Sequence, residues 1–246
     1  MFRIIRLLLK LLAGFLVFFL ITSVLAVAAY RWLPVKVTPL MLIRSWQHRG
    51  ERAYTDWQHT WVPLDSISPY LPVAVMASED QNFPRHNGFD VKAILEAQLE
   101  YERGGRRRGA STISQQTAKN VFLWPESSWL RKGLEAYFTV LIEAMWSKTR
   151  IMEVYLNSIE MGPGLYGAEA VAQSHFDCTA SRLTRSDCAL IAATLPNPIR
   201  YSSLKPSKYM RRRQLQIQRQ MKHINFLSVE LEKQKYEDKA KHEKSL

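Results

Sequence analysis

The sequence is poor in the residues that build metal centres and disulfide frameworks. It has only two cysteines, Cys178 and Cys188, and their ten-residue spacing matches no metal motif. The six histidines are scattered without the spacing of a ligand set, so the sequence indicates no zinc site. In an oxidising compartment the two cysteines can pair, and two free thiols are an equally good interpretation.

Strand patterns and acidic residues are also scarce. Few segments alternate apolar and polar residues as a half-buried strand does, and no internal repeat is visible. The 34 lysines and arginines outnumber the 22 aspartates and glutamates, which gives a formal charge of +12. In a cytosolic protein this charge would suggest nucleic acid. Outside a membrane it suggests anionic lipid headgroups, phosphate-bearing lipids or acidic wall polymers, and no nucleic acid.

A long uncharged run is present near the N-terminus. Residues 11–30 read LLAGFLVFFLITSVLAVAAY and follow three basic residues. A helix of this length, at about 1.5 Å per residue, spans the roughly 30 Å hydrocarbon core of a bilayer. The basic flank predicts a cytoplasmic N-terminus, which puts the rest of the chain outside the cytoplasmic membrane. A cleaved signal peptide is the alternative, because residues 26–28 (Ala-Val-Ala) resemble a cleavage site, but its apolar core usually has only about 7–15 residues.

The remaining chain has the periodicity of a mainly α protein. Predicted helices begin near Ile67, cover 91–101, begin near Thr112, and cover 129–146, 150–157, 168–176 and 187–195. A mobile basic loop is predicted at 103–109. The predicted organisation is a cytoplasmic segment (1–10), a transmembrane anchor (11–30), a connector (31–66), a globular domain (67–213) and a basic tail (214–246). A solvated end is the simplest interpretation of the tail, and contact with the membrane or a partner is the other.

Two polar segments stand out within the predicted domain. In SEDQNFPRHNGFD, Glu79 and Asp80 lie side by side at the end of an apolar run, where two acids are commonly no more than a solvated helix end. In GASTISQQTAKN, a hydroxyl, an amide and a cation recur at i, i+4 and i+7 on one helical face, next to a second amide. Such a face suits sugar hydroxyls or phosphate oxygens, although an ordinary exposed face is also common. Its residues are Thr112, Gln116, Lys119 and Asn120.

A third segment, RKGLE, holds a carboxylate beside two cations. Arg131 and Lys132 lie one helical turn before Glu135, a spacing that on a surface contributes only a few tenths of a kcal/mol. In a cleft the same residues would hold an anionic carboxylate beside a site for pyrophosphate. Glu79 and Glu135 are then a candidate carboxylate pair for glycosyl transfer, which needs a base for the attacking hydroxyl and positive charge for a departing phosphate.

The order of these segments resembles the five motifs of the peptidoglycan glycosyltransferase family, also called glycosyltransferase family 51. The first three are those quoted above, and they are followed by SKTRIMEVYLN with MGPGLYG, and by ALIAATLPNPIRY. The resemblance covers about Ile67 to Arg213 and is closest to the monofunctional, membrane-anchored members. It implies a lysozyme-like, two-lobed α domain behind a single transmembrane helix. Such enzymes polymerise lipid II into β-1,4 glycan strands, with inversion and release of undecaprenyl pyrophosphate.

The resemblance also implies roles for individual residues. Glu79 is expected to be the general base, with Asp80 orienting the site. Glu135 is expected to assist the leaving group or to position Arg131 and Lys132. The Thr112, Gln116, Lys119 and Asn120 face is expected to contact the donor's sugar and phosphates. Phe83 and His86 are expected to shape the site, while Asn157 and the glycines Gly162, Gly164 and Gly167 are expected to be architectural.

The resemblance also bears on cofactors and partners, and two other functions remain as alternatives. No obligatory cofactor is expected, although Mg²⁺ or Mn²⁺ can lie against the pyrophosphate without a dedicated ligand set. Expected partners are lipid II, the growing glycan strand, membrane lipids and proteins of wall synthesis or division. Ser202 and Lys205 match S-x-x-K, but no S-x-N or K-T-G follows, so no transpeptidase domain is expected. The alternatives are a lytic lysozyme-like enzyme and an inactive scaffold of the wall-synthesis complex.

Overall fold

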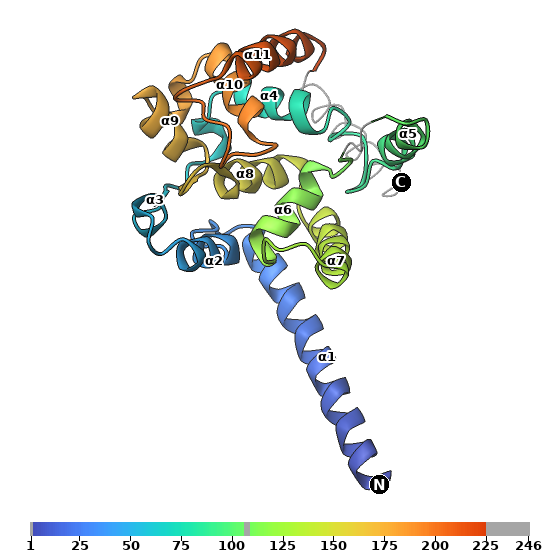
Figure 1. Ribbon diagram of the computed structural model, residues 1–246. Coiled ribbons are helices and arrows are strands. Elements are labelled where there is room, and N and C mark those ends of the chain that lie inside the picture. Colours follow the sequence, from blue (N-terminus) through green and yellow to red (C-terminus); the bar gives the residue numbers. More distant parts are fainter. Residues whose placement is uncertain (1, 106–108, 225–246) are drawn as a thin grey trace, which may run out of the picture.

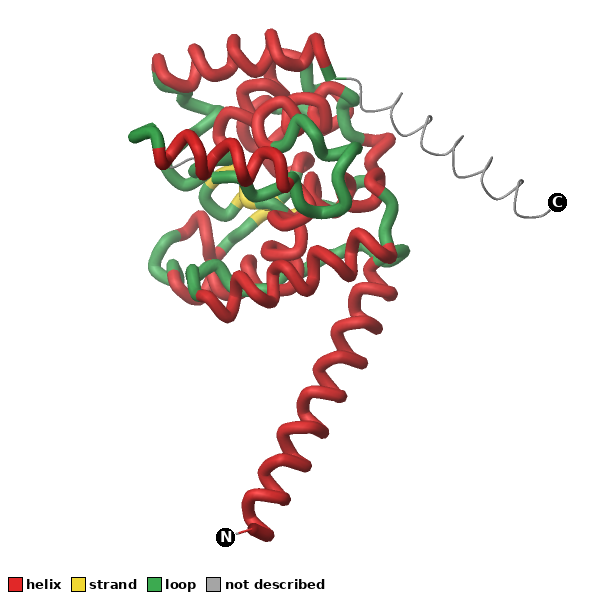
Figure 2. Tube along the Cα trace, turned by 90° about the vertical axis from the view of Figure 1, so that its right-hand side faces the viewer, coloured by secondary structure: helices red, strands yellow, loops and turns green. Residues whose placement is uncertain are grey.

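The structure, a computed structural model, describes residues 2–105 and 109–224. A straight helix, α1 (Phe2–Tyr30), projects from a helical domain, as Figures 1 and 2 show. The uncharged run at 11–30 lies within this helix, which begins earlier than the run because the basic flank is helical too. Residues 106–108 of the predicted basic loop and residues 225–246 of the predicted tail lie outside the described residues.

The described domain is mainly α, as predicted. A group of helices near α1 and a group farther from it are joined by α8 (Figure 1). The near group comprises α2 (Pro39–Gln47), α6 (Ile113–Phe122) and α7 (Trp129–Met145), with the short α3 (Arg52–Thr55) beside it. The far group comprises α4 (Tyr70–Glu79), α9 (Ala168–Phe176), α10 (Arg185–Thr194) and α11 (Lys208–Gln220). The joining helix is α8 (Lys148–Ser158), α5 (Val91–Glu102) lies at the side, and short 3₁₀ turns cover Leu64–Ser66, Ala180–Arg182 and Met221–His223.

Helix starts follow the sequence signals closely. The Thr112 side chain accepts from the backbone of Gln115, and the Gln115 side chain accepts in return, so the predicted capping box is confirmed. Ser128 caps α7 in the same way through the backbone N–H of Arg131. These caps fix where α6 and α7 begin, and both helices carry predicted site residues.

A small sheet, which the sequence did not predict, lies between the two groups of helices. The strands are arranged in the order β1 (Gln58–His59), β3 (Leu165–Tyr166), β2 (Glu160–Gly162). Strand β1 is parallel to β3, with Gln58 opposite Leu165, and β2 is antiparallel to β3. Strands of two or three residues are too short to show an alternating pattern. The sheet joins the segment after α3 to the glycine-rich motif that the sequence indicated only as a turn.

The glycine-rich hairpin between β2 and α9 depends on two special backbone positions. Gly164 has φ +68° and Gly167 has φ +85°, a region that glycine enters without steric cost. A Cβ on Gly164 would lie 1.8 Å from the carbonyl oxygen of Ala53, so only glycine allows the chain to pass this close.

The predicted connector and tail both contribute packed structure. In the connector, the Thr38 side chain accepts from the backbone N–H of Met41 to start α2, and Leu40 and Met41 are buried. At the other end, the predicted tail boundary at residue 214 falls inside α11, where Ile217 is fully buried. The packed domain therefore extends on both sides of the predicted range 67–213.

The last turns of α1 are part of the domain core. Ser23 shares a 2.7 Å hydrogen bond with the Tyr137 hydroxyl on α7, and Val27 is fully buried. The Trp146 indole donates to the carbonyl of Val27 at 2.8 Å, and Arg150 donates to the carbonyl of Tyr30. The helix is thus attached to the domain by buried contacts over several turns as well as by the chain itself.

Candidate active site

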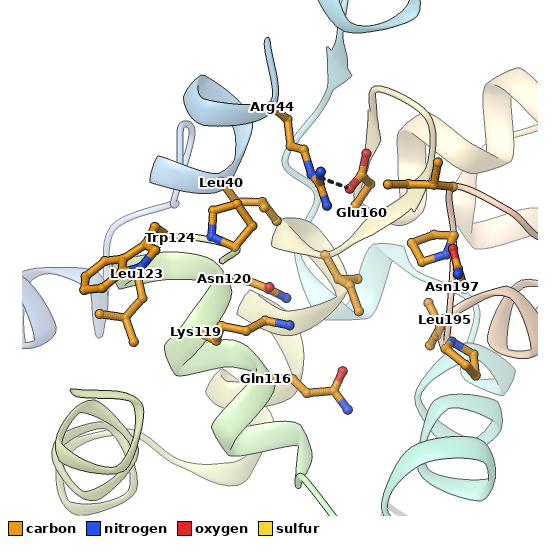
Figure 3. Close-up of a pocket in the computed structure, with 15 residues that line it drawn as sticks. Leu40, Arg44, Gln116, Lys119, Asn120, Leu123, Trp124, Glu160, Leu195 and Asn197 are labelled. Carbon is orange, nitrogen blue, oxygen red and sulfur yellow. Dashed lines mark ion pairs between the residues drawn. The ribbon is translucent and has the colours of Figure 1, made fainter. Parts of the chain in front are cut away.

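Helix α6 presents a polar face to a pocket of about 260 Å³. Gln116, Lys119 and Asn120 line it, and Figure 3 shows their side chains on one side of the space. The other walls come from α2, the segment after α6, β2 and residues 195–199. Three of the four residues predicted to share one helical face therefore line one wall of this pocket, and their contact with a substrate stays a prediction.

The fourth residue, Thr112, does not line this pocket. It is the N-cap of α6 and only 2% exposed. Its hydroxyl donates to the Gly88 carbonyl at 2.6 Å and accepts from the backbone N–H of Gln115. The structure therefore gives Thr112 a capping role, and its contact with the substrate stays a prediction.

Glu79 lies at the C-terminal end of α4, across from α6. One carboxylate oxygen accepts from the Gln116 amide at 3.1 Å and the other accepts from the Ser78 hydroxyl at 2.9 Å. The carbonyl oxygen of Gln116 in turn accepts from the Tyr155 hydroxyl at 3.2 Å, which directs the amide nitrogen to Glu79. Burial, with smaller contributions from the charges of Glu79 and Asp80, raises the pKa of Tyr155 well above its usual value, so this hydroxyl remains a donor.

Asp80 is committed to holding the site together. It is buried, and one oxygen accepts from the backbone N–H of Ile113, the first residue of α6, at 3.0 Å. The His86 ring lies 2.9 Å from the same carboxylate, and the Phe83 ring meets the His86 ring edge-on. Asp80 therefore ties the end of α4 to the start of α6, while Phe83 and His86 form the support beneath it.

Glu135 lies between two cations on α7. One of its oxygens accepts from Arg131 at 2.7 Å, and the other contacts the ammonium of Lys132. Arg131 and Glu135 are buried, and the side chain of Lys132 is 46% exposed. The predicted i, i+3 and i, i+4 pairs are thus formed, and both oxygens of Glu135 are occupied by positive groups.

Lys119 is the unpaired cation at the centre of these groups. None of the residues that the structure describes makes a hydrogen bond or ion pair with its ammonium, which points into the pocket in Figure 3. Burial lowers the pKa of Lys119; the nearby charge of Glu135 opposes this shift, and the positive charges of Arg131, Lys132 and Arg44 add to it. A partly buried cation without a partner favours the binding of an anion.

Sequence reasoning missed Arg44, Tyr155 and Glu160. Arg44 lies in the predicted connector, where Thr38 followed by Pro39 was the available signal for a helix start. Tyr155 sits among the apolar positions of α8 and shows no polar pattern of its own. Glu160 flanks the glycine motif, which drew attention to the glycines alone.

The described residues contain no group of three or more His, Cys, Asp or Glu side chains that could hold a metal ion. Cys178 and Cys188 are both free thiols, so of the two interpretations the structure has the unpaired one. Burial raises the pKa of Cys188 to about 12, which keeps it protonated and unreactive.

A helical domain behind an apolar helix long enough to span a membrane, with a carboxylate near a pocket into which a cation points, is consistent with the class of membrane-anchored enzymes. The family model described as Transglycosylase matches residues 48–222. Among similar curated proteins, one from Bacteroides thetaiotaomicron is 62% identical over 206 residues, covering 84% of this chain and 83% of its own. Proteins from Caulobacter vibrioides (52%; 85% and 88% covered) and Pseudomonas putida strain W619 (51%; 88% and 92% covered) are similar too.

Each of these three relatives is named as a biosynthetic peptidoglycan transglycosylase. The chain belongs to the transglycosylase family, so the resemblance carried by the five motifs is confirmed. It is an enzyme, a peptidoglycan glycosyltransferase that polymerises glycan.

Proposed function

We propose that this enzyme polymerises lipid II, with Glu79 as the general base. The carboxylate takes the proton from the 4-hydroxyl of the incoming GlcNAc as that oxygen attacks the anomeric carbon of the growing strand. The bond from that carbon to the pyrophosphate breaks, and undecaprenyl pyrophosphate leaves with the electron pair, which inverts the configuration. The observation that carries the proposal is the pairing of Glu79 with Gln116, on the same helical face as the unpaired Lys119.

Glu79 is the better base of the two glutamates. Among the residues that the structure describes, its oxygens accept only from a neutral amide and a neutral hydroxyl, so lone pairs remain for a proton. Glu135 has a cation on each oxygen, and protonating it would break two charge-assisted contacts. We therefore assign Glu135 to positioning Arg131 and Lys132 on the leaving-group side.

Lys119 is the residue that we assign to the pyrophosphate. Its ammonium would gain an anionic partner on binding, and Arg131 and Lys132 lie close enough to influence its pKa. Positive charge placed where the leaving group develops negative charge stabilises the transition state. Gln116 and Asn120 supply amides for sugar or phosphate oxygens from the same pocket wall.

A divalent cation fits this site only through the substrate. Because the described residues offer no cluster of metal ligands, Mg²⁺ or Mn²⁺ would be held chiefly by pyrophosphate oxygens. When bound, the ion would neutralise part of the phosphate charge. The protein's own contribution would remain that of Lys119, Arg131 and Lys132.

We further propose that α1 is an uncleaved single-pass anchor, with the N-terminus cytoplasmic and the domain on the other side of the membrane. By length and apolar composition α1 fits one membrane span. Val27, the middle residue of the signal-peptide-like triplet, is fully buried, and its carbonyl accepts from Trp146, which argues against cleavage there. Lipid II is a membrane lipid, so this anchor keeps the site beside its substrate, and the basic surface would favour anionic headgroups.

The test is polymerisation of labelled lipid II by the native enzyme and by Glu79→Gln. Loss of a general base lowers the rate by about 10²–10⁴-fold, so we expect almost no polymer from the variant while lipid II binding is retained. Glu96→Gln, on the exposed side of α5, is the control that should polymerise normally. Full polymerisation by Glu79→Gln would move the base elsewhere.

The same assay separates the rival functions. A synthetic enzyme lengthens strands from lipid II, a lytic enzyme shortens preformed strands, and a scaffold does neither. Partners among proteins of wall synthesis or division are a separate proposal, which the basic surface alone supports.

A further inference from the structure

A polar cluster lies at one wall of the Lys119 pocket, and two of its four residues, Arg44 and Glu160, line that wall. It consists of Arg44 on α2, Tyr54 on α3, Glu160 on β2 and Tyr166 on β3. Arg44 Nε and a carboxylate oxygen of Glu160 are 3.7 Å apart, which is an ion pair but longer than a hydrogen bond. Glu160 is 5% exposed, and Tyr54 and Tyr166 are almost fully buried.

All four side chains carry a buried polar atom without a hydrogen-bond partner among the described residues. The atoms are Arg44 Nε, Glu160 Oε1 and the hydroxyl oxygens of Tyr54 and Tyr166. The Tyr54 hydroxyl lies near the Glu160 carboxylate, but not in the geometry of a formed hydrogen bond. Since buried polar groups are nearly always hydrogen-bonded, four such atoms at one place require an explanation.

The cluster opens toward the reaction site. Arg44 and Glu160 line the same pocket as Gln116, Lys119 and Asn120, and Figure 3 shows the pair facing the α6 side chains across the space. A ligand in this pocket therefore lies beside both the unpaired Lys119 and the Arg44–Glu160 pair, and a small shift of the two side chains would bring their unpartnered atoms to it.

The chemistry of the pair favours a neutral ligand. The charges of Arg44 and Glu160 cancel, and the free carboxylate oxygen repels phosphate while accepting from a hydroxyl or amide N–H. The guanidinium can donate to the oxygens of the same ligand. Trp124, Pro196 and Pro198 add apolar surface beside these groups, as a sugar ring requires. At about 260 Å³ the space suits a single ring rather than a whole disaccharide-peptide.

We propose that Arg44 and Glu160 form a sugar subsite, which holds one uncharged ring of the glycan substrate beside Lys119. This inference rests on the proposed function, because it takes its ligand from the same reaction. Glu160 is a specificity-determining residue in this subsite, and Arg44 is its partner. Tyr54 and Tyr166 lie behind the pair. The Tyr54 hydroxyl is near the Glu160 carboxylate and can position it when a ring is bound.

The test compares two ligands in the Glu79→Gln background, where lipid II should not turn over. Equilibrium binding is measured for lipid II and for undecaprenyl pyrophosphate, which has the phosphates but no sugar. Glu160→Gln should weaken lipid II binding by about tenfold or more, because a hydrogen bond to a buried carboxylate is lost. Binding of undecaprenyl pyrophosphate should change by less than about twofold.

Two further variants guard the interpretation. Asp56→Asn removes the exposed Arg52–Asp56 ion pair on the neighbouring α3 and should change neither affinity. Tyr54→Phe keeps the ring stacked on His48 but removes a buried hydroxyl without a partner. It should weaken lipid II binding while maintaining or raising the melting temperature, whereas a merely structural hydroxyl would lower the melting temperature and leave the affinity ratio unchanged.

Equal weakening for both ligands by Glu160→Gln would overturn the proposal, since the pair would then act on the phosphates or on the fold. Unchanged binding of both would overturn it as well. Polymerisation by the native enzyme is measured separately, so failure of the proposed reaction is distinguishable from failure of the subsite.

Discussion

Lys119 shows how a single residue can oppose stability and serve binding at once. Its side chain is partly buried, its ammonium is unpaired among the described residues, and most of the charges near it are positive, so burial and this repulsion lower its pKa. The charged form is therefore disfavoured in the free protein relative to the unfolded chain. The protein keeps a destabilising charge that only an anionic ligand can compensate.

Replacing this charge should stabilise the fold and abolish activity. We expect Lys119→Met to raise the melting temperature, by about 2–4 °C for each kcal/mol gained in a protein of this size, and to prevent polymer formation. The charged ammonium destabilises the native fold fully below the depressed pKa of Lys119, and this effect disappears as pH rises toward the ordinary value of 10.5. The increase in melting temperature caused by Lys119→Met should therefore shrink at alkaline pH.

Thermal unfolding across a pH series, with an assay of polymer, checks this expectation. Lys92→Met on the exposed face of α5 is the control and should shift neither quantity appreciably. A lower melting temperature for Lys119→Met at neutral pH would mean that the ammonium has a stabilising partner in the folded protein.

Individual residues also show which parts of the site can be predicted from the sequence. The face of Gln116, Lys119 and Asn120 follows from helical periodicity, because the start of α6 has a capping box that fixes the register. The same capping box occupies the Thr112 hydroxyl, and Thr112 does not line the pocket. Helical periodicity alone does not predict this difference. Tyr155 sets the orientation of Gln116 from a different helix, so only the packing of α8 against α6 reveals it.

At the scale of elements, the glycine-rich hairpin controls how the two groups of helices meet. Gly164 passes so close to Ala53 that its backbone joins the far side of the domain to α3, and the carbonyl of Gly164 accepts from the backbone N–H of Gln58. Glu160 lies on β2 of this hairpin. The position of the pocket wall that contains Glu160 therefore depends on the turn at Gly164.

Gly164→Ala should be strongly destabilising for this reason. The added methyl group would lie 1.8 Å from a backbone oxygen at a positive φ, so the hairpin must shift, and we expect a loss above about 4 kcal/mol or failure to fold. Gly133→Ala, on α7 with open space around the added methyl, should instead be neutral or stabilising by up to about 1 kcal/mol. Denaturant unfolding of the two variants provides the comparison, and similar stabilities would refute the steric argument.

Element prediction succeeded where local signals act and failed where tertiary contacts decide. Long periodic helices such as α7 and α8 appear with nearly their predicted bounds. The sheet is too short for a pattern, and α2 lies in the segment 31–66, which the sequence indicated only as a connector. The glycine motif indicated its conformational role, but not that a carboxylate beside it would face the pocket.

At the scale of the whole molecule, α1 is continuous with the catalytic domain. Its last turns cover Tyr137 and Phe138 on α7 and contact Phe122 on α6 through Tyr30. An anchor joined by a flexible linker would leave the domain free to rotate. The contacts of α1 instead hold the domain in one orientation relative to the axis of this helix.

Removal of the whole helix should therefore damage the domain. In detergent, a chain that starts at residue 31 should melt at least about 5 °C below a chain that starts at Phe19, because burial of Val27 alone contributes about 1.5–3 kcal/mol. Thermal melting and size-exclusion chromatography distinguish the two chains, and the shorter one should aggregate. Equal melting temperatures would show that the docked turns contribute nothing to the fold.

The docking of α1 also bears on how deep the domain lies in the bilayer. The uncharged run ends at Tyr30, yet its turns from Ser23 onward are already in contact with α7. If that run spans the hydrocarbon layer, part of α7 shares its depth, and the exposed Trp129 (94%), Leu130 (68%) and Val140 (57%) on α7 face lipid. Acyl chains are then part of the solvent in which this protein folds, so membrane thickness and the choice of detergent alter its free energy of unfolding directly.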